Sequence, residues 1–166
     1  SAARIGDVRL VATSDAEVTT TAGTDTSLKN ITTDLNGVAL AIPATSTIRI
    51  VFSIRKGSGA ANVMQGRVGL NTTNFMSAAG RAWTAATNGA GDGQVVVIIG
   101  PRATNYQTSG ALHAHSYDGA EFVADYSATT ANWAPTTTIT DIQINGQNNG
   151  GSITVGVANV KVYEEL

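Results

Sequence analysis

The clearest pattern in the chain is an alternation from Ser46 to Lys56, in which every second residue from position 48 to position 54 is Ile or Phe. A period of two predicts a β-strand with one face in the core. The opposite face carries Arg49 and Arg55 among its polar residues. Gly57-Ser58-Gly59 predicts a turn directly after this strand.

Other segments repeat this pattern. Residues 38–42 and 62–70 alternate on either side of the first strand, so we expect three consecutive segments to be antiparallel neighbours. The unbroken apolar run from Val95 to Ile99 predicts a central strand buried on both faces. With a further candidate at 6–12 and a weaker one at 17–21, the chain is expected to form about ten strands.

Between these strands lie one turn and one irregular region. Asp118-Gly119 predicts a hairpin that joins strands at 111–117 and 121–127. Residues 71–93 break the alternation and predict a long excursion or a short helix.

Two strands, 138–145 and 152–163, are expected to close the chain. In the second, the apolar positions change phase, from Val155 and Val157 to Val160 and Val162. A slip of one residue predicts a β-bulge.

Composition then sets the fold class. Ile and Val number 27 against 7 Leu, and Thr numbers 23. β-Branched residues favour strands over helices. The 166 residues therefore predict one all-β domain, an antiparallel β-sandwich spanning residues 1–166.

Charge and cysteine content exclude several classes of function. The net charge is −2, and a nucleic-acid-binding surface needs a basic excess. The absence of Cys excludes disulfides, thiolate zinc sites and a Cys nucleophile. No apolar run is long enough for a membrane-spanning helix, so membrane insertion is not expected. Because the sequence opens with Ser-Ala-Ala, we expect it to be a piece of a longer protein.

Several segments together resemble the jelly-roll domains of bacteriophage tail fibres and other virion attachment or decoration proteins. The first is a proline-ended segment leading to an Ile-Arg-Ile strand (38–55), and the second is an Arg-containing strand that ends in Asn (65–71). A Gly-Asp-Gly strand start (91–93) and a closing pair of strands (140–144 and 157–163) complete the set. Where family members usually carry Asn-Gly after the Arg-containing strand, this chain has Asn71-Thr72-Thr73-Asn74.

The resemblance implies a jelly-roll topology and a trimeric, non-enzymatic protein of the virion, as the C-terminal part of a longer chain. Such a domain would bind a host cell-surface glycan or protein receptor, or decorate the particle beside other virion proteins, and would need no cofactor. The alternative is a carbohydrate-binding module of a secreted bacterial enzyme. A small hydrolase is the third possibility.

Catalytic patterns are weak. Only His113 and His115 could act as the base of a nucleophilic triad, and no Gly-x-Ser-x-Gly motif is present. Glu121 and Asp125 would lie about 13 Å apart along one strand. That separation exceeds what either glycosidase mechanism uses.

The His-x-His pair would place two imidazoles on one side of a strand, where they could share a metal ion. Two ligands do not close a site, although a threefold axis would supply six. We interpret His113 and His115 mainly as outward polar residues.

Ligand-binding residues are expected in long loops. Residues 71–93 carry Trp83, and the following loop carries Arg102, Asn105 and Tyr106, which combine an aromatic ring with donors for a polyhydroxylated ligand. Trp133 is a weaker candidate for stacking on a sugar.

Two further sets of residues are candidates for a calcium site or a subunit interface. Asp92 between glycines and the pair Asp15-x-Glu17 lack the ligand count for calcium and are interpreted as turn residues. Val11, Val51 and Val63 have outward phase, which favours a covered face in a homotrimer.

Overall fold

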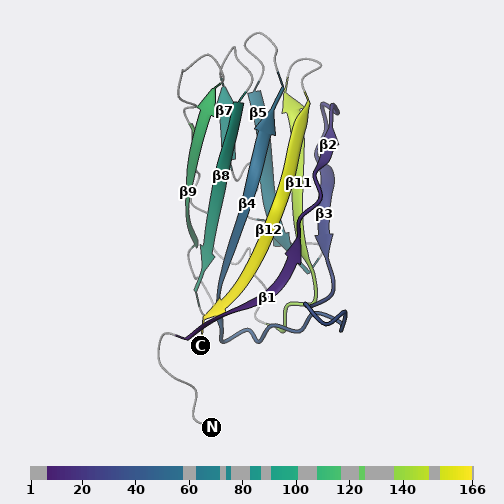
Figure 1. Cartoon of the computed structure of the whole chain (residues 1–166), viewed down its shortest axis with the longest axis vertical. Helices are drawn as coiled ribbons and strands as arrows, with labels where there is room; N and C mark the ends of the chain where they lie inside the picture. Colours follow the sequence, from purple (N-terminus) through teal and green to yellow (C-terminus); the bar gives the residue numbers. More distant parts are fainter. Residues whose placement is uncertain are drawn as a thin grey trace.

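The computed structural model describes most of the chain, namely residues 7–57, 63–71, 74–75, 83–86, 91–100, 108–116, 124–125, 137–149 and 154–165. Over these ranges it contains twelve β-strands and no helix. The strands form two antiparallel sheets that pack face to face (Figure 1). The predicted all-β sandwich is therefore confirmed.

Sheet A is the front sheet in Figure 1. Its strands run in the order β1 (Val8–Ser14), β12 (Val155–Glu165), β4 (Thr47–Lys56), β8 (Gly91–Ile99) and β9 (Thr108–Ser116), and β2 (Val18–Thr20) also pairs with β12.

Sheet B lies behind it. Its order is β10 (Ala124–Asp125), β7 (Trp83–Ala86), β5 (Val63–Leu70), β11 (Ile142–Asn149) and β3 (Thr26–Ile31), and β6 (Asn74–Phe75) pairs with β5.

The connectivity is that of a jelly roll. Eight strands pair first with last, as in a rolled-up hairpin: β1 with β12, β3 with β11, β4 with β8, and β5 with β7. These pairs alternate between the sheets, so that sheet A contains β1-β12-β4-β8 and sheet B contains β3-β11-β5-β7. Strands β9 and β10, from the chain between β8 and β11, extend one sheet each.

The core fills the space between the sheets and comes from the inward residue of each alternation. The predicted core face of the 46–56 segment is confirmed, because Ile48, Ile50, Phe52 and Ile54 are all buried. Opposite them, sheet B contributes Val68, Leu70, Ile142 and Ile144, which are fully buried. Figure 1 shows these sheets stacked along their full length.

The predicted bulge in the last strand is confirmed. The register of β12 against β4 shifts between Ala158 and Lys161, and Asn159 takes a left-handed conformation with φ 52°. Because of the extra residue, Val157 and Val160 are both buried although they differ in phase.

The predicted pairing of neighbouring segments is wrong. Strand β4 lies in sheet A and β5 in sheet B, while residues 38–42 make only isolated bridges, such as Ile42 to Ile139. The hairpin predicted around Asp118-Gly119 is also wrong, since β9 pairs with β8 and β10 pairs with β7. The cause is the jelly-roll path, which sends successive strands to opposite sheets.

Two other expectations need correction. The region 71–93 is not simply an excursion or helix, because it contains β6, β7 and the start of β8. Strand β8 does lie between two partners, as predicted, but it is not buried on both faces, since Val96 and Ile98 are only half-buried.

Candidate functional site

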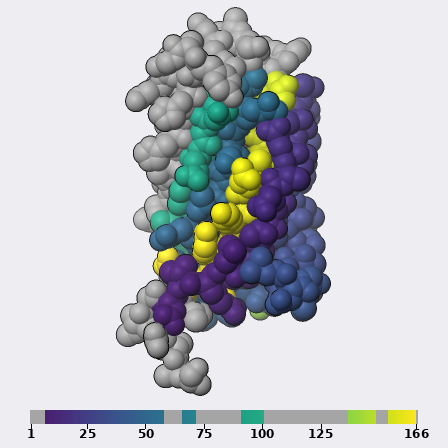
Figure 2. Space-filling model, in the orientation of Figure 1, coloured from purple at the N-terminus to yellow at the C-terminus, as the bar shows by residue number. Residues whose placement is uncertain are grey.

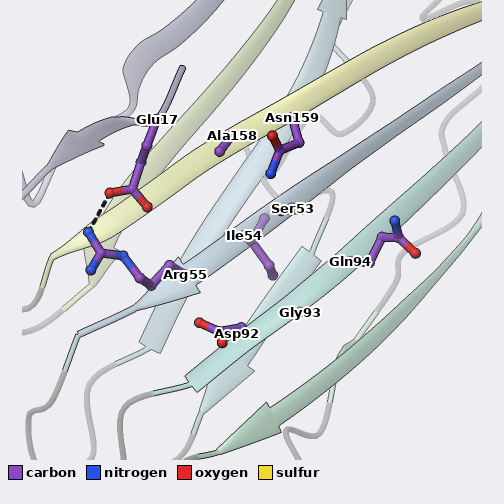
Figure 3. A pocket seen from close by; sticks show the side chains of 9 residues that line it. All are labelled: Glu17, Ser53, Ile54, Arg55, Asp92, Gly93, Gln94, Ala158 and Asn159. Carbon is purple, nitrogen blue, oxygen red and sulfur yellow. Dashed lines mark hydrogen bonds and ion pairs between the residues drawn. The ribbon is translucent and has the colours of Figure 1, made fainter. Parts of the chain in front are cut away.

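A hollow of about 460 Å³ lies on the outer face of sheet A, the face turned away from sheet B. Nine residues line it, drawn in Figure 3: Glu17, Ser53, Ile54, Arg55, Asp92, Gly93, Gln94, Ala158 and Asn159. They come from β4, β8, β12 and the connection between β1 and β2. Figure 2 shows the same face, with the yellow β12 and blue β4 between the teal β8 and the purple N-terminal strands. A volume of this size is typical of small-molecule sites.

Strand register brings the polar side chains together. One row across the sheet contains Gly156, Arg55 and Asp92, and the next contains Ala158, Ser53 and Gln94. Directly opposite residues in antiparallel strands share a face. The hollow therefore presents a guanidinium, carboxylates, a hydroxyl and amides on one rigid surface.

The β12 bulge forms one side of the hollow. Asn159, the left-handed residue, is exposed there, and its backbone N–H donates to the Asp15 carbonyl over 3.0 Å. This bond fastens the β1–β2 connection to the bulge. The bulge thus changes which side chains of β12 face the core, and it also fixes the segment that carries Glu17.

Glu17 forms an ion pair with Arg55, to whose Nη2 its Oε1 is hydrogen-bonded (Figure 3). Space for this carboxylate comes from Gly156, where a Cβ atom would lie 3.0 Å from Glu17 Oε2. Both partners are part-exposed, at 46% for Arg55 and 36% for Glu17. The pair therefore contributes little to stability, but it sets the position of the guanidinium.

Lys29 holds the same connection from the other sheet. Its ammonium donates to Ser14 Oγ over 3.0 Å and to the Ala16 carbonyl, so a side chain of β3 crosses the open edge of the sandwich. Lys29 is only 5% exposed, and this burial lowers its pKa from the usual 10.5, an effect that nearby Asp15 partly opposes. The chain is thereby anchored on both sides of Asp15, through the Ser14 hydroxyl and the Ala16 carbonyl.

A second polar cluster lies on sheet B and has a different character. Arg67 donates two hydrogen bonds to Asp25 Oδ2, at 2.9 and 2.6 Å, and Asn145 Nδ2 donates to the same oxygen at 2.7 Å. These bonds tie the segment before β3 to β5 and β11. We assign the cluster a structural role, because its donors are directed at a carboxylate within the cluster.

Of the sequence-predicted ligand residues, only Trp83 lies in the described part of the chain. Trp83 begins β7 in sheet B, opposite Gly66, and so is a strand residue rather than part of a long loop. Arg102, Asn105, Tyr106 and Trp133 lie outside the described residues. Their role in binding stays a prediction.

The histidines lie at the edge of the candidate site. On β9, His115 is the register partner of Asp92, and His113 that of Gln94. Among the described residues no group of three or more His, Asp or Glu side chains could hold a metal. Asp92 belongs to β8 and not to a turn, which corrects its sequence interpretation.

Sequence reasoning missed Arg55, Gln94 and Asn159 as site residues, although two of its signals pointed toward them. The alternation predicted the outward face of Arg55, and the phase change predicted a bulge between Val157 and Val160, where Asn159 lies. What it lacked was the pairing of β4 with β8 and β12.

Comparisons with known proteins give remote structural similarities. No family model matches the chain, and no curated protein matches it. Among solved structures it is similar to the CBM2 module of the evolved Dit of Lactobacillus casei BL23 phage J-1, with 11% identity and a TM-score of 0.42, over 90% of this chain and 76% of that one.

Two further neighbours are the VP2 subviral particle protein of infectious bursal disease virus and lectin UEA-II complexed with galactose. VP2 is 13% identical, with a TM-score of 0.40, over 96% of this chain but 33% of VP2. The lectin is 9% identical, with a TM-score of 0.41, over 96% of this chain and 93% of the lectin. At these TM-scores the similarities carry no argument about function.

None of the described segments is a helix that could cross a membrane. Taken together, the described residues form a jelly-roll β-sandwich with one polar hollow of ligand size on sheet A.

Proposed function

We propose that this chain is a non-enzymatic glycan-binding domain whose ligand site is the hollow on sheet A. The observation that carries the proposal is the lining itself. Arg55 supplies donors, Glu17 and Asp92 supply acceptors, and Gln94 and Asn159 supply both. Sugar hydroxyls need such alternating partners at close spacing.

Rigid placement supports the proposal. Most of the lining belongs to paired strands, and the remaining residue, Glu17, is fixed by Arg55 and by the anchored connection before it. A preformed site loses little conformational entropy when it binds a ligand.

The test compares two arginines of the same strand and face. Arg55→Ala removes a hollow residue, while Arg49→Ala removes an arginine of similar exposure that pairs with Glu165 outside the hollow. We expect Arg55→Ala to weaken binding to a glycan array five- to thirty-fold, about 1–2 kcal/mol, and Arg49→Ala to bind as the parent does.

Gln94→Ala serves as a second variant, because it changes no charge. If Arg55→Ala and Gln94→Ala both stay folded and bind as the parent does, the hollow is not the site. Trp83→Ala and Tyr106→Ala then test the loop site predicted from the sequence.

We further propose that this domain belongs to a virion, where it binds a host receptor, decorates the particle or contacts other virion proteins. This placement rests on the sequence resemblance, which implies a homotrimer. Individual exposed apolar side chains are compatible with self-association: Leu10 and Leu35 border a small hollow beside β1, and Val8 and Val38 are 50% and 59% exposed.

The three valines whose outward phase favours a trimer in the sequence give this proposal less support than the exposed residues near β1. Val11 and Val51 are half-buried, and the side chain of Val63 lies outside the described part of the chain. A carbohydrate-binding module of a secreted enzyme would share the hollow but would be a monomer. Sedimentation equilibrium distinguishes the two, since a mass of 17.0 kDa at micromolar concentration contradicts the trimer.

A further inference from the structure

Asn36 and Gly37 lie exposed in a turn of the connection between β3 and β4. In an Asn-Gly pair the glycine nitrogen can attack the asparagine side chain, because glycine has no side chain of its own to hinder the approach. Gly37 has a φ of 76°, and a Cβ atom added there would meet nothing within 4 Å. The pair is therefore open to a reaction within its own backbone.

The Asn36 amide is unprotected, and the turn is held by its neighbour Asp34. Among the residues that the structure describes, none is hydrogen-bonded to the Asn36 side chain. Asp34 Oδ1 accepts from the backbone N–H groups of Asn36 and Val38 over 2.8 and 3.0 Å. The N–H of Gly37 donates to the Asp34 carbonyl over 3.1 Å. This last bond must open before the nitrogen can react, and a short exposed turn opens at little cost in free energy.

The same dipeptide occurs at Asn145 and Gly146, in the opposite environment. It lies on β11, which is paired with β5 on one side and β3 on the other. Asn145 is buried, and its Nδ2 donates to Asp25 Oδ2 over 2.7 Å. Gly146 packs closely against Leu28. The reactive geometry is reached here only when the sandwich unfolds around β11.

We propose that Asn36 is a site of spontaneous deamidation in the folded protein. The Gly37 nitrogen gives its proton to a base in solution and forms a bond to Asn36 Cγ. The bond from Cγ to Nδ2 breaks, and the amide nitrogen takes up a proton and leaves as ammonia. Water then opens the resulting succinimide at either carbonyl, which leaves aspartate or isoaspartate at position 36. The net reaction consumes water and releases ammonia, with no oxidation or reduction.

The product changes the surface beside β1. It places a carboxylate on the small hollow that Asn36 lines together with Arg9, Leu10 and Asp34. An isoaspartate also lengthens the main chain within the turn, so the bond from Gly37 to Asp34 cannot keep its geometry. The proposal is independent of the glycan site, because Asn36 does not line the hollow on sheet A.

The test incubates the full chain for several weeks at mildly alkaline pH, once folded and once in guanidinium chloride. Peptide mapping by mass spectrometry then measures conversion at Asn36 and Asn145, with a separation that resolves isoaspartate from aspartate. The pairs at 88–89 and 149–150 lie wholly or partly outside the described residues and are not compared. In denaturant, Asn36 and Asn145 should convert at similar rates. In the folded protein we expect about tenfold more conversion at Asn36 than at Asn145.

Asn36→Gln is the matched control, because it keeps an amide at the same exposed position but needs a larger ring that forms more slowly. Its peptide spanning position 36 should keep its mass under the same incubation. If Asn36 stays unchanged in the folded parent, or if Asn145 converts there as fast as Asn36, the proposal is wrong.

Discussion

Gly146 tests how closely the two sheets approach each other. It lies on β11 with inward phase, and a Cβ atom there would lie 2.8 Å from Leu28 Cδ1 and 3.2 Å from Val155 Cγ1. Leu28 belongs to β3 of the same sheet and Val155 to β12 of the other, and both are buried. Gly146→Ala therefore inserts a methyl group where the sheets meet.

The expected cost follows from these distances. Carbon atoms prefer separations of about 3.5–4.0 Å, so Leu28 must move within a packed core. Overpacking of this kind costs about 1–3 kcal/mol. Replacing glycine restricts the unfolded chain and returns about 0.5 kcal/mol. We expect Gly146→Ala to lower the free energy of unfolding by about 1–2 kcal/mol.

A double-mutant cycle with Leu28→Ala makes the test specific. Leu28→Ala alone should cost about 2–5 kcal/mol, because it leaves a cavity. In the double variant the methyl at position 146 enters that cavity, so the total cost should fall below the sum by at least 0.5 kcal/mol. Urea unfolding measures all four free energies. A Gly146→Ala variant as stable as the parent, or strictly additive costs, would refute this account of the packing.

Three further predictions concern the bulge, the buried lysines and the histidines. Asn159→Val should cost about 1–2 kcal/mol and Asn159→Gly almost nothing, because φ is 52° there; equal thermal stabilities of the two variants would contradict this. Burial lowers the pKa of Lys29 and Lys56 below 10.5, so the folded state holds fewer protons than the unfolded state between the lowered values and 10.5, and stability should rise with pH across that window. Urea midpoints at several pH values should show this rise in the parent and a smaller one in Lys56→Met. His113 and His115 would bind a transition metal near a trimer axis, and elemental analysis of untagged protein without stoichiometric iron, zinc or nickel would contradict that prediction.

The alternation of apolar and polar residues predicted which side chains point into the core, but not which strands pair with each other. Ile48 to Ile54 could be assigned to the core because a period of two fixes which side chains point inward. The same period says nothing about which strand lies alongside. The strands before and after residue 57 were therefore expected to pair, whereas the jelly roll sends them to opposite sheets.

The candidate site shows the same limit. Glu17, Arg55, Asp92 and Asn159 are 37 to 142 positions apart in the sequence. Strand register brings them together, and no local pattern encodes that register. Asp92 even carried a misleading local signal, since flanking glycines are typical of turns. In β8 the outward phase of Asp92 leaves it exposed on the face of the sheet.

The positions of the first and last strands have a mechanical consequence. Val8 and Glu165 are register partners, whereas Arg55 and Asp92 lie near the opposite end of sheet A, next to the pair formed by Lys56 and Gly91. Figure 1 shows β4, β8 and β12 running the length of the molecule between these ends. A ligand in the hollow that pulls against an anchor at β1 or β12 would load the sheet along its strands, so that the cross-strand hydrogen bonds share the force. A force that separates Val8 from Glu165 would instead peel β1 from β12 one hydrogen bond at a time. If the hollow is the ligand site, traction by a bound surface would act along the strands, the direction in which the cross-strand hydrogen bonds resist together.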